Sequence, residues 1–162
     1  MKTAIVYYSM NGNTAYTAAR IAKDTCLDLI EIKPVTQYPD KGIKKFLWGG
    51  KSALMAETPA LEPYTFNADN YDQVVIGFPV WAANIAPPVR TFLKENKKSL
   101  SRMEIAAFAC QSGNGAEKAF RKLRDCLDGK ELKATLVLID PARKKKKEND
   151  EAIEDFRRKL SL

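Results

Sequence analysis

The stretch TAIVYYSMNGNT, Thr3 to Thr14, passes from an apolar, β-rich run into a short turn of hydroxyls, amides and one glycine. A helix-forming segment follows at once, so the turn joins a strand to a helix. Such a turn presents unpaired backbone N–H groups and the positive end of a helix dipole, and both favour an anion, usually a phosphate. The turn contains no Lys or Arg. We therefore expect a phosphate held by neutral hydrogen bonds, as in a bound cofactor, and not phosphoryl transfer.

The rest of the chain alternates strand-like and helix-like segments from end to end. Apolar runs typical of buried parallel strands span residues 4–8, 27–32, 73–78, 105–110 and 134–139. Helical patterns span residues 14–23, 43–57, 88–96, 116–127 and 149–160. The alternation predicts an α/β fold in which helices cover both faces of a parallel sheet. Ligands of such sheets bind at the carboxyl ends of the strands.

Length and composition narrow the class of protein. A chain of 162 residues has the size of one domain, and we expect residues 1–162 to form one. No apolar run approaches the roughly 20 residues of a membrane-spanning helix, and no signal peptide is visible before the first strand. The three cysteines lack CxxC spacing, and histidine is absent, which excludes Ser-His-Asp triads, Cys-His pairs and most metal centres. We expect a cytoplasmic protein without a metal, in which Cys26 and Cys126 belong to the core.

Two further strand ends carry unusual loops. The run 73–78 continues into Pro79, Val80, Trp81 and Ala82, where a Trp in a proline-bounded loop offers a flat apolar face to a planar ring. Packing of the Trp beneath its own loop is an equal alternative. The run 105–110 continues into the loop QSGNG, residues 111–115, whose two glycines let backbone amides approach a heteroaromatic edge. An ordinary strand-to-helix turn would have a similar composition.

The three loops together resemble those of the flavodoxin family, specifically the short-chain flavodoxin-like proteins. The phosphate loop of that family has the form Ser/Thr-x-Thr/Asn-Gly-Asn/Gln-Thr, which residues 9–14 match. Its second loop often reads Pro-Ile/Val-Trp, as at residues 79–81, and its third is rich in Gly and Ser, as at residues 111–115. The resemblance extends over nearly the whole chain. It implies a three-layer α/β/α sandwich with a five-stranded sheet in the order 2-1-3-4-5.

The resemblance also implies an FMN site built from the three loops. The first loop would hold the phosphate, the second would border one side of the isoalloxazine with Trp81 stacked on it, and the third would contact the polar edge of the ring. The implied cofactor-binding residues are Ser9, Met10, Asn11, Gly12, Asn13, Thr14, Pro79, Val80, Trp81, Ala82, Cys110, Gln111, Ser112, Gly113 and Asn114. No catalytic residue of the chain is implied.

Two functions fit such a site. We favour electron transfer, in which the flavin exchanges electrons with redox partner proteins. The alternative is an FMN-dependent NAD(P)H:quinone oxidoreductase, or one with a similar acceptor. The formal charge is +7, where carriers are typically acidic. The loop 111–115 lacks the second aromatic residue that flavodoxins usually place there, and the edge of the proposed flavin is basic through Arg143 to Lys147; both of these features favour the reductase. A flavin-free interaction module is a third possibility, and either a monomer or a homodimer is compatible with all three.

A basic run, Arg143 to Lys147, follows the fifth strand-like segment. We interpret it as a solvated loop, and the alternative is a dock for an acidic protein or a nucleotide phosphate. The run has no interleaved aromatic residues and no nucleic-acid-binding module around it, so we expect no nucleic-acid partner.

Other families with the same alternation of strands and helices need residues that this chain lacks. A Rossmann dinucleotide site needs G-x-G-x-x-G after the first strand, where only Gly12 is present. Response regulators need acidic residues after the first strand, where Ser9 and Met10 stand. Low-molecular-weight phosphatases need a Cys and an Arg in the anion loop, which holds neither.

Overall fold

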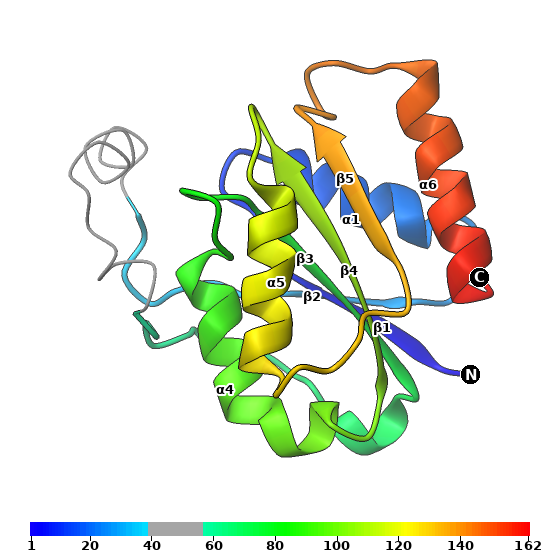
Figure 1. Cartoon of the computed structure of the whole chain (residues 1–162). Helices are drawn as coiled ribbons and strands as arrows, with labels where there is room; N and C mark the ends of the chain where they lie inside the picture. The colour runs from blue at the N-terminus through cyan, green and yellow to red at the C-terminus, as the bar shows by residue number, and fades with distance from the viewer. Residues whose placement is uncertain (39–56) are drawn as a thin grey trace.

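Five parallel strands form one sheet in the order β2-β1-β3-β4-β5 (Figure 1). The computed structural model describes residues 1–38 and 57–162. The strands are β1 (Thr3–Tyr7), β2 (Asp28–Glu31), β3 (Gln73–Pro79), β4 (Glu104–Gln111) and β5 (Thr135–Ile139). The strand order and the parallel pairing confirm the flavodoxin-like sheet that the resemblance implies.

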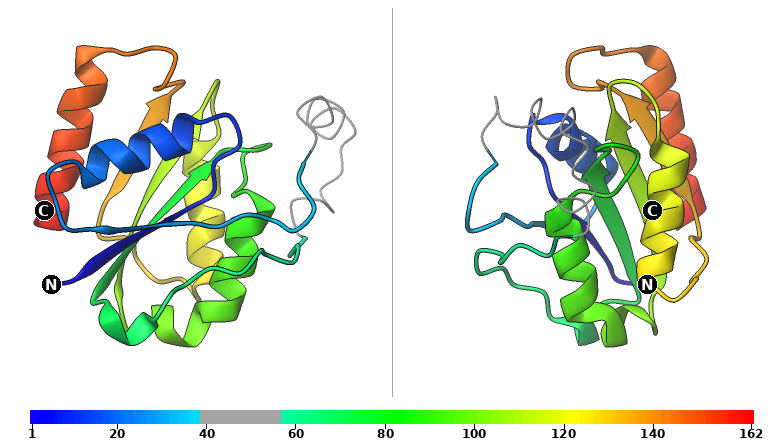
Figure 2. Two further views of the ribbon diagram at one scale, coloured as in Figure 1. Left: turned by 180° about the vertical axis from the view of Figure 1, so that it is seen from behind. Right: turned by 60° about the vertical axis from the view of Figure 1, so that its left-hand side comes forward.

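Helices cover both faces of the sheet, which gives the expected three layers (Figures 1 and 2). One face packs against α1 (Asn13–Ala22) and α6 (Lys147–Leu160), and the other against α4 (Pro87–Leu100) and α5 (Ala116–Cys126). A short 3-10 helix, η1 (Ala68–Asn70), precedes β3. The predicted helix 43–57 lies outside the described residues apart from its last position. None of the described helices is long and apolar enough to cross a membrane.

Each face of the sheet has its own core, and the central strands contribute to both in alternation. Val6 and Ile76 point toward α4 and α5, while their neighbours Ile5 and Val75 point toward α1 and α6. All four side chains are almost completely buried. Strands covered on both faces are apolar at every position, which is why their sequences read as continuous apolar runs.

The pairing of the strands determines where the candidate site lies. β3 pairs with β1 on one side and with β4 on the other, so the carboxyl ends of these three strands meet at one edge. Backbone hydrogen bonds extend the pairing into the loops, from Tyr8 N to Gly77 O at 3.1 Å and from Val80 N to Cys110 O at 2.9 Å. The three loops singled out in the sequence are therefore neighbours in space.

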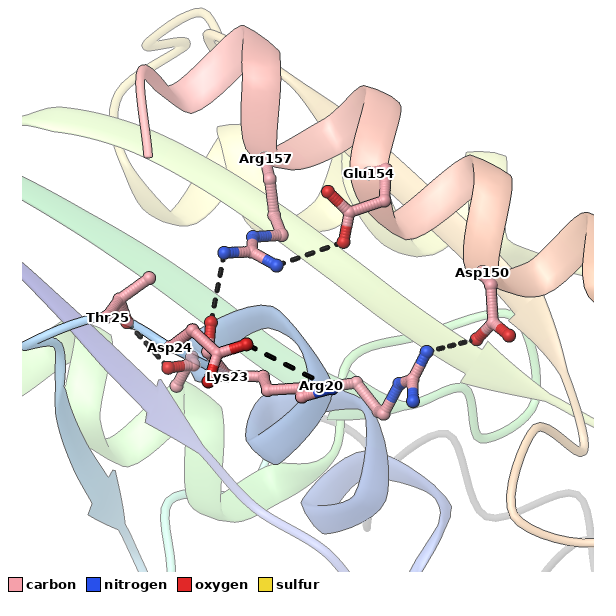
Figure 3. Close-up of polar contacts among 8 residues, drawn as sticks. Arg20, Lys23, Asp24, Thr25, Asp150, Glu154 and Arg157 are labelled. Atoms are coloured by element: carbon pink, nitrogen blue, oxygen red, sulfur yellow. Dashed lines mark hydrogen bonds and ion pairs between the residues drawn. The ribbon is translucent and has the colours of Figure 1, made fainter.

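Polar contacts hold α6 against α1 along the rim of their shared core (Figure 3). The guanidinium of Arg20 on α1 pairs with the carboxylate of Asp150 on α6. Arg157 on α6 donates to Glu154 and to the backbone oxygen of Lys23 at the end of α1, both at 2.9 Å. These contacts fix the position of α6, and with it the loop that connects β5 to α6 beside the carboxyl edge.

Some element ends differ from the prediction. α4 continues to Leu100 instead of ending at residue 96, because the fully buried Leu100 packs its last turn against the core. α6 begins at Lys147, not at residue 149, and Lys147 pairs with Glu151 one turn along the helix. The prediction that Cys26 belongs to the core is wrong, since it is exposed between α1 and β2, and Cys126 is only half-buried.

Candidate functional site

A cavity of about 280 Å³ opens at the carboxyl edge of the sheet, where β1, β3 and β4 end. Its lining comes from the three loops: Met10, Asn11, Asn13, Thr14, Pro79, Val80, Trp81, Cys110, Gln111, Ser112, Gly113 and Asn114. Every one of these belongs to the predicted site. Ser9, Gly12 and Ala82 were also predicted but do not line the cavity. The structure thus gathers most of the predicted residues around one space, and their contact with a ligand stays a prediction.

The N-terminus of α1 forms the anion-accepting end of the cavity. Gly12 precedes the helix with a φ of +84°, a left-handed conformation that side chains disfavour, and its carbonyl accepts from Tyr16 N at 2.9 Å. Ser9 Oγ accepts from Ala15 N at 3.1 Å. Within the described residues, the N–H groups of Asn13 and Thr14 have no acceptor. Two free donors, a helix dipole and a first turn without acidic residues favour an anion here.

Two side chains of this turn organise the structure around it. The Ser9 hydroxyl accepts a hydrogen bond from the first turn of α1, which explains why it does not line the cavity. Asn13 Oδ1 accepts from the backbone N of Ala142, in the loop after β5, at 3.0 Å. The carboxamide NH₂ of Asn13 remains as the donor that could reach a ligand. The partner of Asn13 could not be read from the sequence, because Ala142 lies 129 residues away along the chain.

Trp81 forms an aromatic side of the cavity. Its ring lies between Tyr8 and Tyr38, at centroid distances of 5.8 and 5.3 Å and interplanar angles of 87° in both cases. Its backbone exchanges two hydrogen bonds with Asn84. Only 7% of Trp81 is exposed, although it lines the cavity. Trp81 therefore packs beneath its own loop, as one alternative from the sequence has it, and it also lines the cavity; its stacking on a planar ring stays a prediction.

The third loop is held by two side-chain hydrogen bonds and one close approach. Gln111 Oε1 accepts from Ala116 N, the first residue of α5, at 3.0 Å. Ser112 Oγ donates to Asp140 Oδ1 at 2.6 Å, and Asp140 also pairs with Lys144. The hydrogen bond from Ser112, with the positive charge of Lys144, lowers the pKa of Asp140. Sequence reasoning missed Asp140, although a carboxylate directly after the fifth strand was a usable signal.

Gly115 brings the second and third loops together. Its φ of +107° is left-handed, and a Cβ added there would lie 2.8 Å from Ala83 Cα and 2.9 Å from Ala83 Cβ. No side chain fits at this position without moving the loop that carries Trp81. Gly113, two residues earlier, faces open space and has no such constraint.

Cys110 contributes an apolar wall. The residue is buried at the end of β4, and its Sγ lies 3.4 Å from the Thr17 hydroxyl of α1. Burial raises the pKa of the Cys110 thiol to about 11, despite hydrogen bonds from Thr17 and Thr14 that lower it. The thiol is therefore neutral at physiological pH, and a thiolate nucleophile is not available at this site.

Among the described residues that line the cavity, none carries a charged side chain. The basic run at residues 143–147 directly follows Asp140 and Ala142, which form hydrogen bonds with Ser112 and Asn13 of the cavity lining. Lys144 pairs with Asp140 at 3.3 Å and Lys147 with Glu151 at 3.5 Å, so part of the run is neutralised. Among residues 1–38 and 57–162, no cluster of three or more His, Cys, Asp or Glu side chains is placed to hold a metal.

The arrangement suits a planar heteroaromatic ligand that carries an anionic group. The anion would meet the N-terminus of α1, an aromatic side chain borders the ring position, and backbone and carboxamide groups of the third loop meet its polar edge. The volume of about 280 Å³ is at the lower limit of small-molecule sites, which span roughly 300 to 1,000 Å³. A ligand of the size of a mononucleotide cofactor would therefore project from the cavity into solvent.

Comparisons with known proteins agree with this geometry. The family model described as Flavodoxin matches residues 2–153. A crystal structure of a flavoprotein in complex with FMN from Lactobacillus acidophilus is 25% identical, with a TM-score of 0.67, over 88% of this chain and 95% of that one. A protein from Bacteroides eggerthii is 23% identical, with a TM-score of 0.79, over 99% and 98% of the two chains. The two-electron reduced flavodoxin of Megasphaera elsdenii is 15% identical, with a TM-score of 0.59, over 97% and 99%. No curated protein matches the chain.

Proposed function

The chain belongs to the flavodoxin family, and from this premise we propose that it binds FMN at the carboxyl-edge cavity and carries electrons between partner proteins. One observation carries the proposal: three loops from distant parts of the sequence line a single cavity, with a free helix N-terminus at one end and Trp81 beside it. The complex of a similar flavoprotein with FMN supports the choice of cofactor.

The phosphate of FMN would be held by neutral donors. The free N–H groups of Asn13 and Thr14 suit this role, together with the carboxamide groups of Asn11 and Asn13. Because a hydrogen bond to a charged group is stronger than one between neutral groups, several such donors can hold the dianion without a Lys or Arg. The phosphate then keeps its negative charge close to the redox centre.

The ring of FMN would lie between the second and third loops. Trp81 is held edge-to-face by two tyrosine rings, so it borders the ring position without having to be ordered by binding. The third loop, tied to α5 by Gln111 and to Asp140 by Ser112, would present its backbone to the polar edge. FMN supplies the one- and two-electron redox chemistry when it is bound, and these residues orient it and limit its contact with water.

The small volume of the cavity favours electron transfer over the conversion of a substrate. A ligand that projects from the cavity can exchange electrons with another protein at the surface. We also propose a cytoplasmic location, with which three free cysteines are consistent.

A reductase that takes hydride from NAD(P)H and reduces a quinone or a similar acceptor is the second candidate. One observation favours it: among the residues of the described part of the chain that line the cavity, Trp81 is the only aromatic one. The opposite face of a flavin ring would then have no aromatic cover from these residues, and a nicotinamide could approach it.

Anaerobic mixing of the FMN-loaded protein with NADPH distinguishes the two functions. The electron carrier is expected to keep its yellow absorbance for many minutes with NADPH and to lose it on photochemical reduction. Bleaching within seconds of mixing with NADPH alone would contradict the carrier and support the reductase. A protein that takes up no FMN at all would contradict both.

Gly115→Ala is expected to weaken FMN binding by tenfold or more. The added Cβ would collide with Ala83 and force the loop that carries Trp81 away from the third loop. Strain of this kind costs about 1–3 kcal/mol. Flavin fluorescence titration measures the change. Gly129→Ala is the matched control, because it also places a side chain at a left-handed φ of +78°, meets no atom within 4 Å and does not line the cavity. Equal effects of the two substitutions would contradict the argument.

A further inference from the structure

Beside the cofactor cavity, the outer side of α5 carries positive charge along two adjoining hollows of about 620 and 560 Å³. Lys118 and Arg121 line both hollows, and Lys122 lines the second. The first hollow also contains Gln111 and Asn114, which line the cofactor cavity as well. The basic side of α5 is therefore continuous with the mouth of the cavity.

These cations are not neutralised by neighbouring carboxylates. Lys118, Arg121 and Lys122 are exposed, and no carboxylate of the described residues lies within 4 Å of their charged atoms. The basic residues at the end of α6 differ, since Arg157, Arg158 and Lys159 each pair with an acidic residue of their own helix. Glu117 and Asp125 also line the hollows but leave an excess of positive charge. The positive charge of α5 is thus available to a binding partner.

An apolar strip borders the cations of α5. Val137, on the edge strand β5, lines the first hollow and also a third hollow of about 490 Å³. The third hollow contains Ile139, which is 47% exposed, and the side chains of Lys144 and Lys146. Lys144 is partly neutralised by Asp140. Glu148 lines the same hollow as Lys146, but Lys146 forms no ion pair with a described carboxylate. Two apolar side chains therefore lie between cations of α5 and cations of the loop after β5.

We propose that this region, the α5–β5 surface, docks an acidic electron-transfer protein. Protein interfaces combine an apolar centre with a polar rim, and complementary charge guides the encounter. The cations are spread over three hollows around an apolar strip, an arrangement that fits an acidic protein surface better than a single small anion. The inference rests on the proposed electron-carrier function, since a partner docked here would lie against the mouth of the cofactor cavity.

Binding of a plant-type [2Fe–2S] ferredoxin, used as an acidic one-electron carrier, tests the docking surface. The variant Lys118→Gln/Arg121→Gln removes two cations of the surface. The control Lys94→Gln/Lys98→Gln removes two exposed cations of α4 that line none of the three hollows. Calorimetry on the flavin-free proteins at an ionic strength of about 0.01 M, where screening extends over about 30 Å, gives the affinity without depending on FMN.

We expect the α5 variant to bind this ferredoxin at least tenfold more weakly than the wild-type protein, and the α4 control to bind within twofold of it. At an ionic strength of about 1 M the difference should vanish, because screening then acts within about 3 Å. Equal affinities of the α5 variant and the wild type, equal losses in the two variants, or no binding by the wild type would each overturn the docking proposal.

The same proteins loaded with FMN separate this proposal from the function on which it rests. The rate of electron transfer from reduced ferredoxin should fall in parallel with the affinity. If binding depends on α5 while the loaded wild-type protein accepts no electrons, the docking surface stands and the electron-carrier function fails. If electrons pass at the same rate in the wild type and the α5 variant, the function stands and the docking surface is wrong.

Discussion

Replacing Asn11 by aspartate is expected to weaken FMN binding by about 100-fold or more without disturbing the fold. Asn11 is exposed in the turn before α1 and lines the cavity at its anion-accepting end. The substitution preserves shape but adds a negative charge beside the proposed phosphate position. Two unit charges about 5 Å apart repel by roughly 3 kcal/mol at an effective dielectric constant of about 20, and about 2.7 kcal/mol already corresponds to 100-fold.

The Asn11→Asp experiment has an internal and an external control. Riboflavin lacks the phosphate, so its affinity should change little in the same variant. Asn114→Asp makes the same isosteric change in the third loop, at the proposed ring end of the cavity, and should affect FMN less. The apoprotein should be as stable as the wild type or slightly more so, because an acidic residue near a helix N-terminus is favourable. Equal losses for FMN and riboflavin would show that the phosphate does not lie at this turn.

Replacing Gly77 by alanine is expected to lower the free energy of unfolding by about 3 kcal/mol. Gly77 lies in β3 between Tyr7 of β1 and Phe108 of β4. An added Cβ would lie 2.2 Å from Phe108 Cζ and 2.6 Å from its Cε1. The Phe108 ring is completely buried in the core beneath α1 and α6, so it has no free space into which to move. Overpacking of this kind costs typically 1–3 kcal/mol, and this contact belongs at the upper end.

A second substitution distinguishes the collision from a general weakening of β3. Phe108→Leu leaves a void on its own, but it removes the ring atoms that an alanine at position 77 would meet. The double variant Gly77→Ala/Phe108→Leu should therefore lose less stability than the sum of the single variants, by about 1 kcal/mol or more. Urea denaturation of the flavin-free proteins gives the change in unfolding free energy for the two single variants and the double variant. Strict additivity would contradict the packing argument.

The elements of this fold could be predicted well because most of its strands are buried on both faces. A central strand that is apolar at each position stands out in the sequence, and β1 and β3 were located to within one residue at each end. Helix ends were less accurate. α4 continues past its predicted end at residue 96, and the buried contact of Leu100 that extends the helix depends on the tertiary structure.

Most of the residues that line the cavity could be predicted, but the hydrogen bonds that its polar side chains make could not. Once the strand order is known, the three loops can be placed at one edge of the sheet. The resemblance to the flavodoxin family supplied that order. Ser9 and Gln111, however, bond the first turns of α1 and α5, and Asn13 bonds the loop after β5. The edge-to-face packing of Trp81 between Tyr8 and Tyr38 likewise depends on residues far apart in the sequence. Such pairings leave no pattern in one sequence.

The central claim is that FMN occupies the cavity between the three loops, and a ¹H–¹⁵N NMR titration of the flavin-free protein tests it most directly. Addition of FMN is expected to shift the amide signals of Asn11 to Thr14, the indole N–H of Trp81 and the amides of Gln111 to Asn114. Amide signals far from the cavity, such as that of Leu100 at the C-terminal end of α4, should not shift. Shifts that avoid these loops, or an unchanged spectrum at millimolar FMN, would contradict the account.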